Sequence, residues 1–147
     1  MRVLFGLLLG LAGELHACKG EDPADWARSH QELRSTKGHF SGGAWSPSVD
    51  AWGGTKHRVM KCLAAHATAK RLRAAPLRGL MGTPDEVLRC PSTACSDAIG
   101  KGDWQPGGSP AEPGELWLYD WRGRHDRLLI VMAAGTARRS GWLYARE

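Results

Sequence analysis

The stretch from residue 115 to residue 147 constrains the fold most, because its side chains alternate by type as those of β-strands do. Aromatic residues recur at every second position in the first part of this stretch and again near its end. The aromatic positions are Trp117, Tyr119, Trp121, Trp142 and Tyr144. Because successive side chains of a strand point to opposite faces of a sheet, we expect the five rings to share one face.

Between the two aromatic parts, residues 128–132 are apolar at every position. This pattern is typical of a central strand that is covered on both faces. Turn residues at 122–124 and 135–136 separate the strands, so the stretch predicts a three-stranded antiparallel meander. One face of this sheet can take the protein's own helices. The other face is either covered by irregular chain or kept for a partner.

Two helices are predicted before the sheet. Apolar residues within 60–67 recur at the spacing of one helix face, and Thr55 is a suitable N-cap for that helix. A second, short helix is predicted over residues 76–81, where proline suits the first turn and Gly82 ends the helix. The predicted fold class is therefore α+β, with two N-terminal-side helices packed on the three-stranded meander.

The chain has 147 residues, which is enough for one domain. Residues 19–54 are polar and rich in glycine and serine, and they predict an irregular region with a short helical piece around 26–33. Residues 55–147 hold the patterned elements and form the predicted α+β domain. Within it we expect a brief strand over 86–89 and a connection over 100–114 with little internal structure.

The first residues predict export. Residues 3–12 form an uncharged apolar run with the length of a signal-peptide core, too short to span a bilayer. Residues 15–18 resemble the bacterial lipobox, so residues 1–18 are interpreted as a signal segment and Cys18 as a lipidation site. Acyl chains on Cys18 would hold a lipoprotein on a membrane, facing the periplasm or the cell surface. The alternatives are a soluble secreted or periplasmic protein with a plain Cys18 thiol, and a buried N-terminal helix without export.

The remaining cysteines allow two interpretations. Cys90 and Cys95 flank a short loop that a local disulfide could close, and Cys62 would then be a buried helix thiol. Alternatively, Cys62 joins His57 and His66 of the same helix, with Cys90 or Cys95, in a zinc-like ligand set. The first interpretation is preferred, and no metal or cofactor is predicted.

A further set of residues, in the turn after the second helix and in the strands, matches a known pattern: Gly82, Pro84, Asp85, Trp117, Tyr119, Leu128 and Ile130. With these residues the chain resembles the BamE (SmpA/OmlA) type of small outer-membrane lipoprotein. The same two-helix, antiparallel-sheet unit occurs in β-lactamase-inhibitor proteins. The resemblance covers roughly residues 55–147, although the connection over 89–114 is long for this family.

The resemblance implies a non-catalytic module that acts as a scaffold, stabiliser or inhibitor for an envelope protein partner. Independently of it, an aromatic sheet face is the kind of surface that supplies interface hot spots. The candidate partner-binding residues are Trp117, Tyr119, Trp121, Trp142 and Tyr144. The alternative is that this face packs the helices, or is covered by Trp26, Trp45 and Trp52. A second hypothesis is a soluble small domain that binds a metal or a small ligand.

Charge narrows the list of partners only slightly. The formal net charge is +5, and basic residues cluster over 70–78 and over 122–127. Such clusters can meet anionic headgroups or an acidic protein, although solvated surface is the simpler interpretation. No nucleic-acid-binding motif is visible, and export would remove the chain from nucleic acid. No triad or carboxylate pair suggests catalysis, so the chain is predicted not to be an enzyme.

Overall fold

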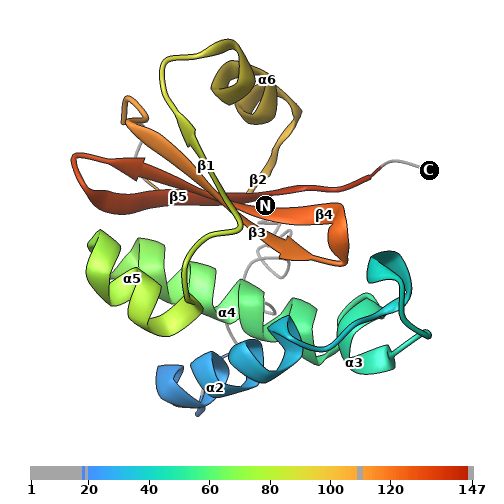
Figure 1. The fold of residues 1–147 in the computed structure, drawn as a ribbon. Coiled ribbons are helices and arrows are strands. Elements are labelled where there is room, and N and C mark those ends of the chain that lie inside the picture. The colour runs from blue at the N-terminus through green and yellow to red at the C-terminus, as the bar shows by residue number, and fades with distance from the viewer. Residues whose placement is uncertain (1–17, 19, 109–110, 146–147) are drawn as a thin grey trace, which may run out of the picture.

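A computed structural model of the chain describes residues 18, 20–108 and 111–145, which form helices and one antiparallel sheet (Figure 1). The helices that precede the sheet in the sequence lie on one of its faces, and a single helix, α6 (Thr93–Lys101), lies on the other. The protein is therefore α+β, as the sequence predicts. In chain order the elements are α2 (Pro23–Arg34), the 3-10 helix η1 (His39–Ser41), α3 (Pro47–Asp50), α4 (Thr55–Ala69), α5 (Ala74–Met81), β1 (Glu86–Arg89), α6 (Thr93–Lys101), β2 (Asp103–Trp104), β3 (Glu115–Trp121), β4 (Gly123–Ala133) and β5 (Thr136–Leu143).

The sheet has five strands in the order β1-β3-β4-β5-β2, and every neighbouring pair is antiparallel. The predicted meander is its centre, β3-β4-β5, and two short edge strands extend it. In the register Trp117 lies opposite Ile130, and Leu128 lies opposite Trp142. The expectation of three strands was incomplete because β2, with two residues, is too short to give a periodic pattern.

The two predicted helices correspond to α4 and α5. Gly54, one residue before Thr55, is the N-cap of α4, so Thr55 is the first helical residue and not the cap. Helix α5 begins at Ala74, two residues before Pro76, and ends before Gly82. The φ of Gly82 is 78°, a backbone conformation that side-chain-bearing residues rarely adopt, which explains why the helix stops there.

The aromatic face of the sheet packs against α4, α5 and α2. Trp117, Trp121 and Trp142 are each at most 1% exposed, and Tyr119 is fully buried. These rings fill a core with apolar side chains of the helices, among them Met60, Leu63, Leu77, Met81 and Trp26. The prediction that these four residues form a partner-binding surface is therefore wrong. The stated alternative is correct: large rings on this face fill the core of a small domain.

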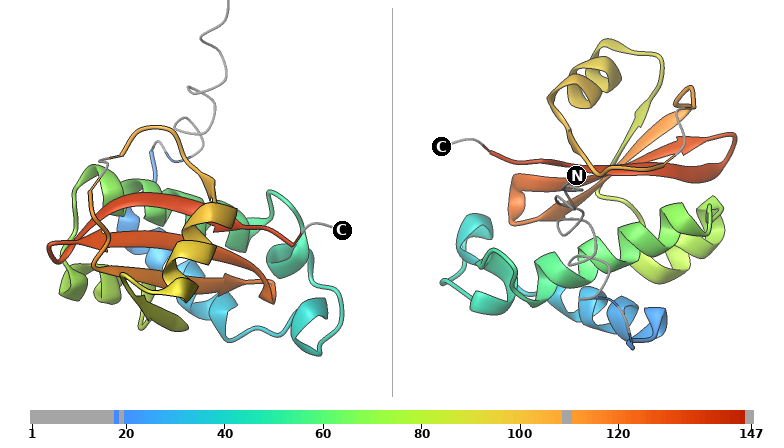
Figure 2. Two further views of the ribbon diagram at one scale, coloured as in Figure 1. Left: turned by 90° about the horizontal axis from the view of Figure 1, so that it is seen from above. Right: turned by 180° about the vertical axis from the view of Figure 1, so that it is seen from behind.

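The other sheet face is covered by the long connection between β1 and β3. Helix α6 lies across this face (Figure 2). Cys95 and Ala98 of α6 pack on a second apolar cluster formed by Leu116, Leu118, Leu129 and Val131. Cys90 and Cys95, the candidate pair, are joined by a disulfide at the start of this segment. This face is thus covered by the chain itself.

Residues before α4 belong to the same packed unit. The helical piece expected around 26–33 is present as α2, where Trp26 and His30 are buried. The expectation that residues 19–54 are otherwise irregular was incomplete, because η1 and α3 are also helical. Trp26 of α2 packs into the main core. The sequence predicts a loop for most of this segment because apolar residues are sparse in it.

Cys18 is bonded to Cys62 of α4, a residue 44 positions further along the chain. A sulfur atom in a disulfide cannot also carry a thioether lipid, so this structure contradicts both the lipidation of Cys18 and a free buried thiol at Cys62. The rest of the predicted signal segment, residues 1–17, lies outside the described residues. In the part of the chain that is described, no helix combines the length and the apolar character needed to cross a bilayer.

Candidate binding site

Two tryptophans are exposed on the connection between α2 and α4. Trp45 is 56% exposed and Trp52 is 58% exposed. Among the described residues, Val87 is the one other large hydrophobic side chain with comparable exposure, at 41%. Two largely exposed indoles on one connection are unusual for a small domain and point to an interaction surface. We call Trp45 and Trp52 the tryptophan surface.

Trp52 is held in place by aromatic residues at the end of the sheet. Its ring centroid lies 5.2 Å from that of His57, 5.2 Å from that of Trp121 and 4.8 Å from that of Tyr144. The Cζ atom of Arg122 lies 5.4 Å from the Trp52 ring centroid, a cation–π contact. These contacts support one side of the indole and leave the rest of it open to solvent.

Trp45 is connected to the sheet by a chain of rings. Its centroid lies 6.5 Å from that of His39, which lies 5.1 Å from that of Phe40. Phe40 in turn stacks on His125 of β4, with 4.5 Å between centroids. Both tryptophans therefore connect to the hairpin end of the sheet through other aromatic side chains.

Asp50, at the end of α3, orders the loop that contains the two tryptophans. The Oδ2 atom of this fully buried carboxylate accepts hydrogen bonds from the backbone N–H groups of His39, at 3.0 Å, and Ser46, at 2.8 Å. The Nε1–H of Trp121 donates to the carbonyl oxygen of Val49 at 2.7 Å. The two bonds to Asp50 close the loop on itself, and the bond from Trp121 joins it to the sheet, so the tryptophan surface is preorganised.

His57 connects α4 to the tryptophan surface. Its Nδ1 atom accepts a hydrogen bond from Gly53 N–H at 3.0 Å, and its Nε2 atom lies 3.4 Å from Tyr144 Oη. Burial lowers the pKa of His57 to about 3, with further lowering by the charges of Lys61 and Arg122. The ring is therefore neutral at pH 7, and since Nδ1 is an acceptor, the ring proton is on Nε2.

A groove of about 610 Å³ opens beside the tryptophan surface, between the end of α6 and the last residues of β5. Its side chains are mostly basic or apolar, and among the described residues that line it none is aspartate or glutamate. The residues that give the groove its character are Lys101, Arg124, His125, Arg127, Leu143 and Tyr144. We call it the basic groove.

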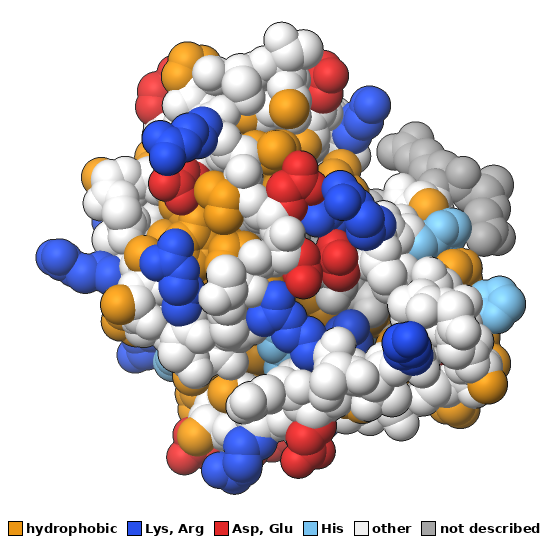
Figure 3. Space-filling view, in the orientation of Figure 1, with side chains coloured by type: hydrophobic (Ala, Val, Ile, Leu, Met, Phe, Trp, Pro, Cys, Tyr) orange, Lys and Arg blue, Asp and Glu red, His pale blue; other side chains and the backbone are white. Residues whose placement is uncertain are grey.

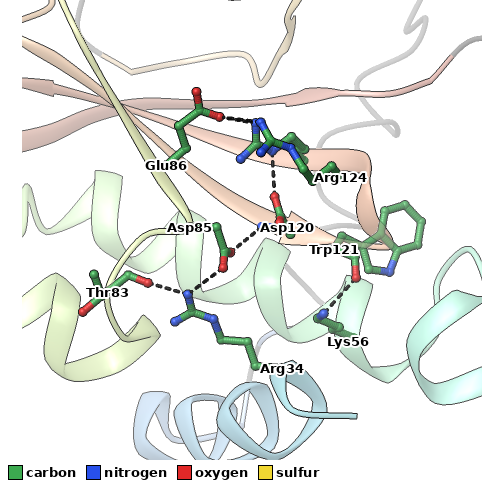
Figure 4. A network of polar contacts seen from close by, with 9 residues as sticks. Arg34, Lys56, Thr83, Asp85, Glu86, Asp120, Trp121 and Arg124 are labelled. Carbon is green, nitrogen blue, oxygen red and sulfur yellow. Dashed lines mark hydrogen bonds and ion pairs between the residues drawn. The ribbon is translucent and has the colours of Figure 1, made fainter. Parts of the chain in front are cut away.

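The two arginines of the groove take part in a surface network of ion pairs (Figure 4). Arg127 donates through Nε to Asp120 Oδ1 at 2.7 Å and through Nη1 to Glu86 Oε2 at 2.6 Å. Arg124 also donates to Glu86, at 3.0 Å, but its side chain is 72% exposed. Arg127 is thus held by two carboxylates, whereas most of the Arg124 side chain remains accessible.

The same network continues toward the helices, where it is structural. Arg34 of α2 donates to Thr83 O and, at 3.1 Å, to Asp85, which accepts from the backbone N–H of Asp120. The buried Lys56 donates to Trp121 O at 2.8 Å, and burial lowers its pKa. Basic and acidic side chains are accordingly interspersed on this face (Figure 3). The network fastens α2 and α4 to the sheet.

The alternative zinc set is not assembled. Cys62 is in a disulfide and supplies no thiolate, while Cys90 and Cys95 are bonded to each other. Across the described residues, no group of three or more His, Cys, Asp or Glu side chains is placed to hold a metal ion. Tyr144 alone among the predicted aromatic candidates is partly exposed, and it lies between the tryptophan surface and the basic groove.

We expected Trp45 and Trp52 only as possible cover for the sheet, and not as an exposed surface. The sequence feature that could have indicated their exposure is that these large rings occur in a glycine-rich polar segment without periodic apolar neighbours. Comparison with protein-family models, with curated proteins and with solved structures found no match to this chain.

Proposed function

We propose that the protein is a non-catalytic binding module that holds a protein partner on the tryptophan surface. The main support for this proposal is the exposure of Trp45 and Trp52, 56% and 58%, on a loop that hydrogen bonds to the buried Asp50 keep in place. Tryptophan is among the residues most enriched at binding hot spots. A rigid loop loses little conformational entropy on binding, so each indole contributes more to affinity.

The proposed location is outside the cytoplasm, in the cell envelope. Two disulfides support an oxidising compartment, since structural disulfides are rare in reducing ones. The apolar run over residues 3–12 supports export. Because Cys18 is bonded to Cys62, we propose a soluble exported protein and not one anchored by a lipid on Cys18.

The resemblance to the BamE type supports a scaffolding or inhibitory role for an envelope protein. Helices α4 and α5 followed by the meander β3-β4-β5 are the arrangement that this resemblance implies. The segment with α6 is an addition to that unit. This segment covers the second sheet face. We therefore place the partner at the end of the sheet where the tryptophan surface lies.

Site-specific crosslinking tests this proposal. A photoreactive residue in place of Ser48, which lies between the two tryptophans and is exposed, should crosslink one protein in cells that make the full chain. That protein would then be purified and its affinity measured. Trp45→Ala and Trp52→Ala should each weaken binding at least about tenfold.

Val87→Ala is the matched control, because Val87 is exposed on the edge strand β1 and away from the tryptophan loop. It should leave the affinity unchanged. Equal loss of affinity in the Val87 and tryptophan variants would refute the proposal, as would unchanged binding by both tryptophan variants.

A further inference from the structure

The basic groove is continuous with the tryptophan surface on two sides. Tyr144 lines the groove and its ring centroid is 4.8 Å from that of Trp52. His125 also lines the groove and stacks on Phe40, which leads through His39 to Trp45. A ligand that contacts both indoles therefore has the groove directly beside it.

The groove carries positive charge that the structure leaves accessible. Lys101 is exposed and makes no ion pair with any described residue. Arg124 gives one N–H to Glu86, and a guanidinium has five N–H donors, so it keeps donors for a second carboxylate. Arg127 is already held by Asp120 and Glu86 and fixes the floor of the groove.

Two acidic residues are close in sequence to the groove-lining residues. Asp126 is fully buried, paired with Arg122 at 2.6 Å, and accepts from the backbone N–H of Ala145 at 2.9 Å. Asp103, which follows Gly102, is exposed and does not line the groove. The end of α6 carries the negative pole of its helix dipole, but the Ile99 carbonyl there accepts from Gly102 N–H and from Trp104 Nε1–H. The residues that line the groove therefore favour an anion.

The lining of the groove suits a peptide whose side chains alternate in type. Arg127 of β4 lies opposite Leu143 of β5 in the register, and both residues line the groove. The end of α6, with Lys101, lines the other side. An extended peptide in which acidic and apolar side chains alternate can place carboxylates at Lys101 and Arg124 and an apolar side chain against Leu143.

From these observations we infer that the partner presents an extended acidic segment, which lies in the basic groove with its carboxylates at Lys101 and Arg124. This inference rests on the proposed function and names the chemistry of the partner. The volume of about 610 Å³ suits a short run of side chains. The indoles would hold the apolar neighbours of the acidic residues.

The test uses the purified full chain and two fluorescein-labelled decapeptides, in which leucine alternates either with glutamate or with glutamine. Fluorescence polarisation at low salt should show that the glutamate peptide binds at least about tenfold tighter than the glutamine peptide. Lys101→Gln with Arg124→Gln should remove most of this preference. Raising the salt concentration should reduce it as well.

Arg71→Gln with Arg73→Gln is the charge-matched control. These arginines are exposed at the α4–α5 turn, outside the groove, and the double variant removes the same charge. It should change the affinity less than twofold. Equal loss in both double variants would overturn the inference, because binding would then follow total charge. Tighter binding of a uronic-acid oligosaccharide than of the glutamate peptide would overturn it in favour of a glycan.

The same measurements separate this inference from the function on which it rests. If Trp52→Ala weakens partner binding while the Lys101 and Arg124 variant does not, the acidic segment is refuted and the binding function stands. If neither variant affects partner binding, the acidic segment and the binding function are both refuted. Melting curves of the variants should match that of the parent chain, since Lys101 and Arg124 are exposed.

Discussion

The imidazole of His57 lies parallel to the indole of Trp121, with 3.9 Å between the ring centroids and 6° between the ring planes. His57 belongs to α4 and Trp121 to the end of β3, so this contact joins the helical layer to the sheet. Trp52 meets both rings nearly at a right angle. The position of the exposed indole is therefore set by the core packing beneath it.

Trp142→Ala and Trp52→Ala should have very different effects on stability. Trp142 is 1% exposed within the core, so its truncation should cost roughly 3 to 5 kcal/mol and unfold much of the protein. Trp52 is 58% exposed, and its truncation should cost about 1 kcal/mol or less. Denaturant unfolding followed by circular dichroism measures both. Similar losses would contradict the assignment of core and surface.

Acid should destabilise the protein through two buried histidines. Burial lowers the pKa of His30 to about 4. The positive charges of Lys56 and Arg34 lower this pKa further, whereas the negative charge of Asp85 raises it. Burial also lowers the pKa of His57, to about 3. Both pKa values are below the unfolded value, so stability is complete above about pH 6.5 and is lost as pH falls toward 4. His30 alone should account for a loss of order 3 kcal/mol.

His30→Leu isolates this effect. Within the described residues, neither ring nitrogen of His30 has a hydrogen-bond partner, so an apolar side chain of similar size should be tolerated at pH 7. The free energy of unfolding of the variant should fall less steeply below pH 6.5. His39→Leu, at an exposed position, is the control and should keep the parent's pH dependence. An unchanged slope for His30→Leu would show that other groups cause the acid response.

The two disulfides should contribute unequally. The Cys18–Cys62 bond joins residues 44 positions apart, and its loss should cost about 4 kcal/mol by loop entropy. The Cys90–Cys95 bond spans 5 positions, and its loss should cost about 2 kcal/mol. Paired serine variants and chemical denaturation measure the two costs. A mature chain whose mass includes acyl groups on Cys18 would contradict the first disulfide.

Asp50→Ala should loosen the tryptophan surface. It leaves the N–H groups of His39 and Ser46 without their acceptor, which should cost about 1 to 3 kcal/mol. Trp45 should then be more mobile, and partner binding should weaken although no contact residue has changed. Fluorine NMR of the protein made with 5-fluorotryptophan reports this motion, with the Trp45 signal assigned by its loss in Trp45→Phe. An unaltered Trp45 signal would mean that Asp50 does not order the loop.

The parts of the fold that could be predicted are those that local periodicity in the sequence indicates. Helix α4, the stop at Gly82 and the meander all follow from spacing within a few residues. Trp45 and Trp142 are the same residue type, yet one is exposed and the other buried. Alternation places a ring on a strand face but does not say what covers that face. That depends on long-range packing, as does the pairing of Cys18 with Cys62.

The Cys18–Cys62 disulfide makes residues 18–62 a covalent ring that contains both exposed tryptophans. A single proteolytic cut anywhere between residues 19 and 61 would open this ring without releasing a fragment. The cut chain would keep its full mass on a gel run without reductant and separate into two pieces when reduced. The loop with the two exposed tryptophans can therefore be nicked by a protease and still remain attached to the fold that positions it.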